Sequence, residues 1–450
     1  MGRFWLPWVL VFNTLGVAFG SILPGLALAP EVAETVTLAQ LRQVDSLQGA
    51  KRIQSRVQAE LENLSPARFT RDMGELAPYF TLAQVVYRVN QRITLEESAD
   101  ADYRRALELA TQAIAARNAA AENADESLET FAHQEFLWRA AIAQLDQIPE
   151  ESLLSRKAIA KKTEYEKILA PVAARVDELE SGFLQEIAEN TGRPEAIRIT
   201  ICHLSGECRN YQGDIPPESP ASLIKLPIAV ALMDKVTREG IDLDTEVYVE
   251  PYNWTENANG AQIYVDREYS LREIMARMIK ESNNIATNQL VDYIGWDEMN
   301  QTLGDRGFEQ TRVNTKLAGD STLPSVNTNS GGGPNVMTTN EVTEMMRQIY
   351  TFQHPGDDEI LDALVGQYDW EFGYTAIKQL RDKRVAWIGE KTGQNSRVIG
   401  SSVAVKIDNE RYVMTVTIDD SANQVMLRQV IGEVIQHILD DGHLVNVTGR

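Results

Sequence analysis

The chain has 450 residues, of which 43% are hydrophobic and 24% charged, and this composition excludes collagen-like, mucin-like and wholly disordered proteins. Its 43 basic and 65 acidic residues give a net charge of −22, which disfavours binding to nucleic acid or to anionic lipid. The two cysteines exclude a disulfide-stapled miniprotein and an iron–sulfur site built from cysteine alone.

The first region, residues 1–30, is predicted to be a signal peptide or a membrane anchor. Arg3 is its only charge, and the apolar run 4–29 is long enough to span a bilayer, which needs about 20 apolar residues. Ala27-Leu28-Ala29 has the form of a cleavage site, although Pro30 directly after it disfavours cleavage. We therefore expect an exported bacterial protein, either periplasmic or anchored to the outer face of the membrane.

The second region, residues 36–190, is predicted to be all helical. Alanine, glutamate, leucine, glutamine and arginine dominate, and apolar residues recur at the three- and four-residue spacing of a helix face. One helix is predicted to end at Pro149 and the next to stop before Pro171. The run from Trp138 to Tyr165 resembles a tetratricopeptide-like helix pair, which implies a groove for a protein partner. The other interpretation is a helical spacer that packs on itself.

The third region, residues 193–445, changes to a strand pattern. Strands are predicted at 197–204, 207–211, 385–388, 398–407 and 411–419, with helical stretches between the two groups and a closing helix at 425–439. Strands at both ends of one segment predict an antiparallel sheet assembled from sequence-distant pieces, with the closing helix packed on it. The predicted fold class is therefore α+β with α/β/α layers, preceded by an all-α region.

Cys202 and Cys208 flank a predicted tight turn at Ser205-Gly206. Positions that face each other across a hairpin can meet the spacing that a disulfide needs, and export places them in an oxidising compartment. The alternative is two reduced cysteines packed as small hydrophobic residues.

The familiar catalytic and metal-binding motifs are absent. The chain contains no His-Glu-x-x-His, no Gly-x-x-x-x-Gly-Lys, no Gly-x-Ser-x-Gly and no histidine pair at metal-binding spacing. No metal or organic cofactor is therefore implied. The histidines lie too far apart to suggest a Ser–His–Asp triad: they are His133, His203, His354, His437 and His443. A serine nucleophile would need another activating group.

Lysine is a candidate for that group. Ser222-Leu223-Ile224-Lys225 opens a predicted apolar helix, in which residues three apart share a face, so the Lys225 amine can reach the Ser222 hydroxyl. A lysine accepts a proton from serine only when burial or a second cation lowers its pKa toward neutrality. Two later motifs strengthen the pattern: Ser282-Asn283-Asn284 after a predicted helix at 271–280, and Lys391-Thr392-Gly393 at the end of a strand.

In order and interval, these three motifs resemble those of the penicillin-recognising serine enzymes, which include the class A β-lactamases and the low-molecular-mass DD-peptidases. The resemblance implies a cleft between a helical subdomain and the α/β part. It implies Ser222 as the acylated nucleophile, Lys225 as its proton acceptor and Ser282 as the group that passes the proton to the leaving nitrogen. Lys391 would keep this proton relay cationic.

The same resemblance implies the contacts with the substrate, a β-lactam or a peptidoglycan-like small molecule. Asn284 would bind the substrate amide, and Thr392 the substrate carboxylate. The backbone amides of Ser222 and Gln394 would form an oxyanion hole. Gly393 completes the predicted binding residues.

The sequence also departs from the family pattern. Class A β-lactamases carry a deacylating glutamate in a loop between the second and third motifs, but segment 307–334 offers only Glu309, which lies too early, and Asp320. Asn283 stands where class A enzymes usually have aspartate. The pattern does not place the arginine that pairs with the substrate carboxylate, and Arg397 is a candidate for it.

Three interpretations therefore stay open. The first is a β-lactamase-like serine hydrolase, and the second is a DD-peptidase-like enzyme or esterase acting on acyl-D-Ala-D-Ala-type substrates. The third is a penicillin-binding sensor or an inactive scaffold whose helical region binds a partner.

Overall fold

The computed structural model describes residues 44–63, 73–123, 126–257, 260–318, 329–420, 422–441 and 444. The chain divides into two compact units, Met1–Val176 and Asp177–Arg450. The predicted leader at 4–29 lies outside the described residues. Within the described ranges, no helix combines the length and the apolar surface needed to cross a bilayer.

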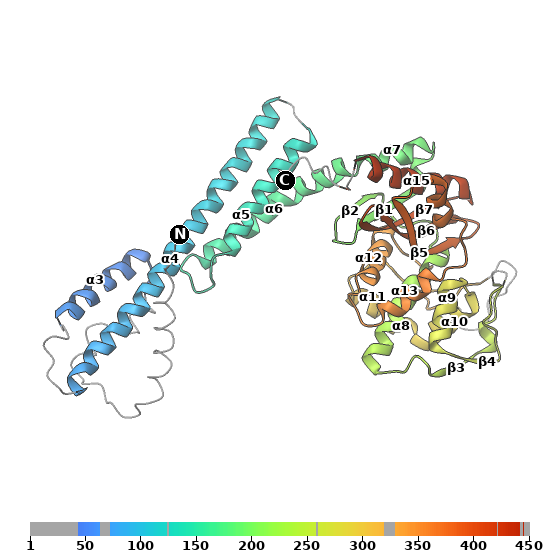
Figure 1. Cartoon of the computed structure of the whole chain (residues 1–450), viewed down its shortest axis with the longest axis horizontal. Coiled ribbons are helices and arrows are strands. Elements are labelled where there is room, and N and C mark those ends of the chain that lie inside the picture. Colours follow the sequence, from blue (N-terminus) through green and yellow to red (C-terminus); the bar gives the residue numbers. More distant parts are fainter. Residues whose placement is uncertain are drawn as a thin grey trace, which may run out of the picture. The chain divides into compact units, whose positions relative to one another are not determined.

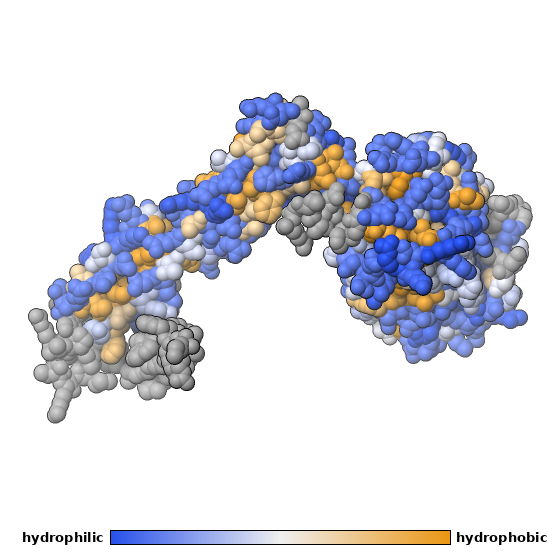
Figure 2. Space-filling view, turned by 45° about the horizontal axis from the view of Figure 1, so that its top comes forward, coloured by the Kyte–Doolittle hydropathy of each residue, from blue (hydrophilic) through white to orange (hydrophobic). Residues whose placement is uncertain are grey.

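The first unit is helical, as predicted. Its elements are α3 (Leu47–Asn63), α4 (Met73–Asn123), α5 (Leu128–Asp146) and most of α6 (Ser155–Glu180). α4 packs against both α3 and α5 (Figure 1). One apolar cluster contains Val57 and Val89, and another contains Trp138, whose ring centroid lies 5.1 Å from that of Tyr165. Apolar residues are visible between these helices on the face shown in Figure 2. The tetratricopeptide-like resemblance stays a prediction.

α6 does not stop before Pro171, so that prediction is wrong. A proline removes one backbone hydrogen bond from a helix interior and costs roughly 3 kcal/mol. Here the helix buries Tyr165 before the proline and Val176 after it. Because burying a large apolar side chain contributes about 1.5–3 kcal/mol, continuing the helix offsets the cost of the proline.

The second unit contains an antiparallel sheet of five strands in the order β2-β1-β7-β6-β5. The strands are β1 (Ile197–His203), β2 (Cys208–Tyr211), β5 (Val385–Gln394), β6 (Val398–Ile407) and β7 (Glu410–Asp419). β1, the first strand of the sheet in the sequence, pairs with β7, the last. The predicted α+β fold, with a sheet assembled from sequence-distant pieces, is therefore confirmed.

Helices cover both faces of this sheet (Figure 1). One face shares an apolar core with α7 (Gly182–Asn190), α14 (Gly373–Leu380) and α15 (Gln424–Asp441). A second core holds α8 (Lys225–Glu239), α9 (Leu271–Lys280), α10 (Asn284–Ile294), α11 (Trp296–Asp305), α12 (Thr339–Tyr350) and α13 (Asp357–Val365). A short ribbon of β3 (Glu246–Val249) and β4 (Arg267–Ser270) packs beside α9.

The second unit begins at Asp177, earlier than the predicted boundary at residue 193. Leu184, Ile187 and Ala188 of α7 are buried in the same core as α15. In the sequence, α7 looks like one more member of the helical region. Its apolar face is nevertheless covered by the sheet domain, and this packing places it in the second unit.

Cys202 and Cys208 are bonded to each other, with an S–S distance of 2.01 Å. They are direct partners in the β1–β2 register. The disulfide therefore fastens β2, a strand of only four residues at the edge of the sheet, to its neighbour.

Candidate active site

Ser222 lies in the turn that enters α8. Ala221–Ile224 form a 3-10 turn, and α8 follows from Lys225, so Ser222 precedes the α-helix rather than opening it. The spacing of three residues still has the predicted effect, because Lys225 Nζ lies 3.0 Å from Ser222 Oγ. Ala221, immediately before the serine, has a φ of 44°, a left-handed conformation that costs a non-glycine residue about 1–3 kcal/mol.

Ser282 connects α9 to α10 and also has a left-handed backbone, with a φ of 55°. Asn283 caps α10, since its side chain accepts a hydrogen bond of 2.9 Å from the Ala286 N–H. Asn284 then opens α10 and donates from Nδ2 to the Glu256 carbonyl oxygen at 2.8 Å. The cap and this hydrogen bond fix the second motif against its neighbours.

The Lys225 amine is buried and lies within hydrogen-bond distance of four oxygens. Nζ is 2.5 Å from the Ser282 carbonyl oxygen and 2.7 Å from Asn284 Oδ1, two atoms that can only accept. Two hydroxyls complete the set, Ser222 Oγ at 3.0 Å and Ser282 Oγ at 2.9 Å. A neutral amine has two N–H groups, so the two obligatory acceptors leave its lone pair available to a hydroxyl.

The two lysines of the motifs meet at Ser282. Burial lowers the pKa of Lys225 well below its ordinary value, and the nearby Lys391 cation lowers it further. Burial lowers the pKa of Lys391 to about 8, while Asp369 and Glu390 act in the opposite direction. Lys391 Nζ lies 3.1 Å from Ser282 Oγ. Hydrogen bonds thus join five of the predicted site residues: Ser222, Lys225, Ser282, Asn284 and Lys391.

Glu390 is a buried carboxylate beside Lys391 that the sequence motifs did not indicate. It accepts hydrogen bonds from the Gly373 N–H at 2.7 Å, the Tyr374 N–H at 3.0 Å and Ser401 Oγ at 2.6 Å. Burial raises its pKa. Its contacts tie β5 to the start of α14. The one sign of Glu390 in the sequence is that it is an acid directly after the apolar stretch 385–389.

β5 brings the third motif alongside the Ser222 turn. A β-carbon on Gly393 would lie 3.1 Å from the Ser222 nitrogen and 3.0 Å from the Leu223 nitrogen, so this close approach favours glycine. Thr392 is buried, and Gln394 is exposed at the end of the strand.

Arg397, the predicted partner of a substrate carboxylate, lies exposed in the turn after β5. Its carbonyl oxygen accepts a hydrogen bond of 2.5 Å from the Asp420 N–H. None of its contacts among the described residues joins it to the motif side chains, so the structure does not support its placement with them.

The segment after α11, in which the family resemblance implies a deacylating carboxylate, returns to α10. The Leu317 N–H donates to Asn288 Oδ1 at 2.8 Å, and Asn288 Nδ2 donates to the Leu317 carbonyl oxygen at 2.9 Å. Asn288 lies about one helical turn after Asn284, so this backbone is held close to the second motif. The side chain that this backbone carries beside Asn288, that of Leu317, is apolar. Glu309 is exposed earlier in the segment, and Asp320 lies outside the described residues.

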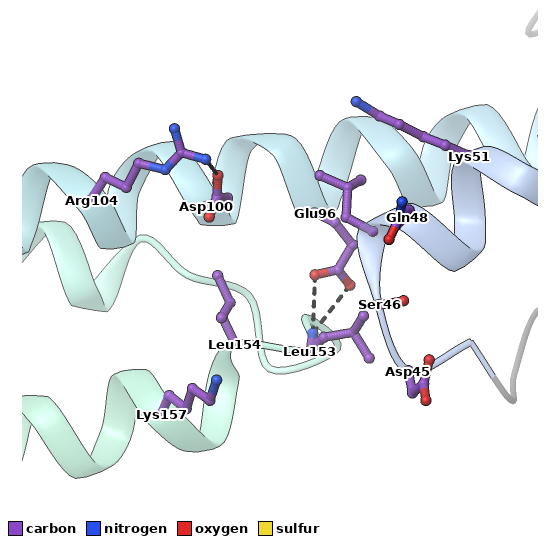
Figure 3. Close-up of a pocket in the computed structure, with 11 residues that line it drawn as sticks. Asp45, Ser46, Gln48, Lys51, Glu96, Asp100, Arg104, Leu153, Leu154 and Lys157 are labelled. Atoms are coloured by element: carbon purple, nitrogen blue, oxygen red, sulfur yellow. Dashed lines mark hydrogen bonds and ion pairs between the residues drawn. The ribbon is translucent and has the colours of Figure 1, made fainter.

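A pocket of about 470 Å³ lies in the first unit, where the start of α3 meets α4 and the segment before α6 (Figure 3). Its buried acid, Glu96, accepts hydrogen bonds from the Leu153 N–H at 3.1 Å and from Ser152 Oγ at 2.9 Å. Arg104 forms an ion pair with Asp100. We interpret this pocket as a helix junction whose buried acid is satisfied by its neighbours. Across the described ranges, no group of three or more His, Cys, Asp or Glu side chains could hold a metal ion.

A family model described as "Beta-lactamase enzyme family" matches residues 184–441. No curated protein matches the chain. Among solved structures, PBP-A is 24% identical with a TM-score of 0.49, and the match covers 58% of this chain and 96% of that one.

Two further solved structures are similar to the same extent. An acyl-enzyme complex of a PBP-A mutant with penicillin G is 23% identical with a TM-score of 0.49, and the match covers 58% of this chain and 97% of that one. A β-lactamase from Sphaerobacter thermophilus is 19% identical with a TM-score of 0.49, and the match covers 60% of this chain and 98% of that one.

Proposed function

Because this chain belongs to the beta-lactamase enzyme family, we propose that it is a serine hydrolase whose Ser222 is acylated by β-lactams or by related amides and esters. One observation carries the proposal: two buried lysine amines, Lys225 and Lys391, lie within hydrogen-bond distance of Ser282 Oγ, and one of them also reaches Ser222 Oγ.

Lys225 acts as the base in the proposed reaction. Its lone pair takes the Ser222 proton while Oγ attacks the substrate carbonyl carbon, which becomes tetrahedral and carries a negative oxygen. The backbone N–H groups of Ser222 and Gln394 stabilise that oxygen, at about 3 kcal/mol per donor. The close approach of Gly393 to the Ser222 nitrogen supports this pairing, because it brings the end of β5 beside the turn.

Ser282 completes acylation. It receives the proton from Lys225 and gives its own to the leaving nitrogen, so the carbonyl–nitrogen bond breaks and an ester remains on Ser222. The distances of 2.9 Å and 3.1 Å from Ser282 Oγ to the two amines support this route. Lys391 stays protonated, and its positive charge stabilises the negative charge that develops on Ser282 Oγ during the transfer.

The proposed substrate contacts follow the same geometry. Asn284 binds the substrate amide through the second N–H of Nδ2, because the first donates to the Glu256 carbonyl oxygen and Oδ1 accepts from Lys225. Thr392 and Gly393 contact the substrate from β5. Thr392 contacts the substrate carboxylate. No contact with the substrate is assigned to Arg397.

A second candidate function is DD-peptidase-like or esterase activity on acyl-D-Ala-D-Ala-type substrates. The apolar side chain of Leu317 favours it. Fast release of a lactam requires a group that activates water, and the described backbone beside Asn288 carries an apolar side chain instead. We therefore expect a β-lactam to form a long-lived ester on Ser222 and to turn over slowly.

The test uses the full-length protein with a fluorescent penicillin and a chromogenic cephalosporin. We expect one covalent adduct, mapped to Ser222 by mass spectrometry, and slow colour development. Ser222→Ala should abolish the adduct, while Ser205→Ala, a matched change at an exposed serine of the β1–β2 turn, should leave it unchanged.

The outcomes separate the interpretations. Rapid cephalosporin turnover would favour an efficient β-lactamase, and release of D-alanine from an acyl-D-Ala-D-Ala peptide would favour the peptidase. Stable labelling without either activity would favour a penicillin-binding sensor. No adduct, or an equal adduct on Ser222→Ala, would contradict acylation at this serine.

A further inference from the structure

A second serine with a histidine beside it lies in the turn between β1 and β2. Ser205 Oγ is 2.6 Å from His203 Nδ1, and Nε2 of the same ring is 2.8 Å from Glu410 Oε2. Serine, histidine and carboxylate are therefore joined in the order of a catalytic triad. The sequence does not indicate this group, because Glu410 follows His203 by 207 residues and is brought to it by the pairing of β1 with β7.

The hydrogen bonds of His203 determine which ring nitrogen carries the proton. The Ser205 backbone N–H donates to Nδ1 at 3.2 Å, so Nδ1 has a lone pair and also accepts from the Ser205 hydroxyl. The proton of the neutral ring is then on Nε2, which donates it to Glu410. Serine faces Nδ1 and the carboxylate faces Nε2, the reverse of the familiar triad, and either nitrogen of an imidazole can serve as the base. The ring can thus take the serine proton while Glu410 stabilises the imidazolium.

The hairpin holds these side chains in place. The Cys202–Cys208 disulfide closes the hairpin next to His203, and the Gly206 N–H donates to the His203 carbonyl oxygen at 2.9 Å. The His203 ring packs edge-on against Tyr412, with the ring centroids 5.1 Å apart. A base that is already oriented loses less entropy on the way to the reactive geometry.

This group is open to solvent and distant from the first site. Ser205 is exposed, and the side chain of Glu410 is 54% exposed. His203 lies four residues along β1 from Ile199, which shares a row of the sheet with Thr392 three strands away. His203 and Thr392 are therefore about 13 Å apart along the strands and about 14 Å apart across them. Ser205 cannot take part in the chemistry at the first site, and a reagent reaches it directly from solvent.

We propose that Ser205, His203 and Glu410 form a second nucleophilic site, which hydrolyses carboxylic esters with a good leaving group, such as aryl esters. Because the turn is open, the reactivity of the ester decides the rate more than its binding does. A phenolate leaves without a proton, so one base is sufficient. Penicillin is expected to label Ser222 alone, because the groups proposed to bind it belong to the first site.

The reaction has two steps. Ser205 Oγ attacks the ester carbonyl carbon and gives its proton to His203 Nδ1; the bond from that carbon to the phenolic oxygen breaks, and phenolate departs. His203 then releases the proton to solvent. In the second step a water molecule gives a proton to His203 and adds its oxygen to the acyl carbon. The bond to Ser205 breaks, the serine oxygen recovers a proton from His203, and a carboxylic acid leaves.

The test measures hydrolysis of p-nitrophenyl acetate by full-length Ser222→Ala, in which the first site has no nucleophile. Adding Ser205→Ala is expected to lower kcat/KM about tenfold or more, because a positioned general base accelerates such steps strongly. A fluorophosphonate probe, which loses fluoride to an activated serine and stays bound, should label Ser205. Adding Ser55→Ala instead should change nothing, since this exposed serine of α3 donates only to the Lys51 carbonyl oxygen, at 3.1 Å.

Two further changes in the Ser222→Ala protein test the partners of Ser205. His203→Gln should lose as much activity as Ser205→Ala, and the two together should lose no more, as expected for residues that act as a unit. Glu410 acts through His203 as a positioning residue. Glu410→Gln should slow hydrolysis about tenfold, and Glu410→Asp, which restores a carboxylate, should recover part of the rate. All variants should keep the thermal transition of their parent, because none removes a buried apolar side chain.

Three results would overturn the second site. One is a Ser222→Ala protein that hydrolyses the ester no faster than buffer. Another is loss of activity in His203→Gln but not in Ser205→Ala, which would make the imidazole itself the nucleophile. The third is a rate that neither change alters, or a probe bound elsewhere. Acylation of Ser222 is unaffected by any of these results, and a failure of penicillin to label Ser222 leaves the second site standing.

Discussion

Lys225 and Lys391 have the same side chain, and both are buried, but their neighbours differ. The Lys225 amine faces oxygens of serine and asparagine, and its nearest charge is a second cation. Lys391 lies near two carboxylates, those of Asp369 and Glu390, which raise its pKa against the effect of burial. The surroundings therefore favour a proton on Lys391 and a free base at Lys225.

The acylation rate is expected to follow a bell-shaped pH profile. Lys225 accepts a proton only when neutral, so the rate falls as the pH drops through its lowered pKa. It falls again when Lys391, whose pKa is about 8, loses its charge. Single-turnover labelling with penicillin from about pH 5 to about pH 10 measures both limbs.

Lys391→Arg supplies the control for this profile. Arginine stays protonated across the range, so the remaining activity should lose its alkaline limb. A wild-type rate that still increases above about pH 9 would contradict a requirement for charged Lys391.

A carboxylate at position 317 is expected to shorten the life of the acyl-enzyme. Leu317→Glu would place an acid on the backbone that Asn288 holds close to the second motif, where it can activate water. We expect penicillin release to accelerate about tenfold or more, measured as loss of the covalent adduct over time. Leu317→Gln has nearly the same shape without a base, and equal lifetimes in the two variants would refute this role.

At the scale of single residues, the sequence predicted those that belong to short motifs. Ser222, Lys225, Ser282 and Lys391 were found by their order and spacing, and the structure brings them together. Asp369 and the Leu317–Asn288 pair were not predicted. They act through contacts between segments that are distant in the sequence, so no local pattern marks them.

The approach of β5 to the Ser222 turn is the contact between elements that shapes the site. Gly393→Ala would place a β-carbon 3.0–3.1 Å from two backbone nitrogens, so strand and turn must separate by a few tenths of an ångström. We expect acylation to slow about tenfold, because small errors in the position of reacting groups are costly. Gly304→Ala in α11, where a β-carbon meets nothing within 4 Å, should leave the rate unchanged. Equal rates for both variants would argue against this contact.

Elements with strong local signals were predicted well. The helix expected at 271–280 matches α9, whose start is fixed by the Ser270 side chain accepting from the Glu273 N–H. The strand pattern of β5 covered only 385–388, although the motif at 391–393 was expected to end a strand, and the observed strand runs without a break to Gln394. Its last residues are polar or glycine, and they form a strand because they pair with β6, for example Lys391 with Ser402. Pairing of this kind has no signature within the strand itself.

The whole second unit is expected to fold and to be acylated as the fragment 177–450. A shorter fragment, 193–450, lacks α7 and exposes the core that Leu184 and Ile187 cover. Since each of these side chains contributes about 1.5–3 kcal/mol, the shorter fragment should lose roughly 3–6 kcal/mol of unfolding free energy. Urea denaturation followed by circular dichroism measures the difference, and equal midpoints would show that α7 is dispensable.

We also propose that the protein is exported and that residues 4–29 direct it. The Cys202–Cys208 disulfide supports this proposal, because such bonds persist in oxidising compartments. Added protease should digest the protein in cells whose outer barrier has been permeabilised and whose inner membrane is intact. Protection under those conditions would contradict export.

The pairing of β1 with β7 has a consequence for how the protein folds while it is being synthesised. Ile197 lies opposite Ile418, so nearly the entire domain must emerge before its central strands can meet. Such non-local closure is slow, and until it occurs the β1 segment leaves the side chains of Ile197, Ile199 and Ile201 without their partners. A chaperone that shields this early strand during synthesis or secretion is therefore expected to increase the yield of folded protein.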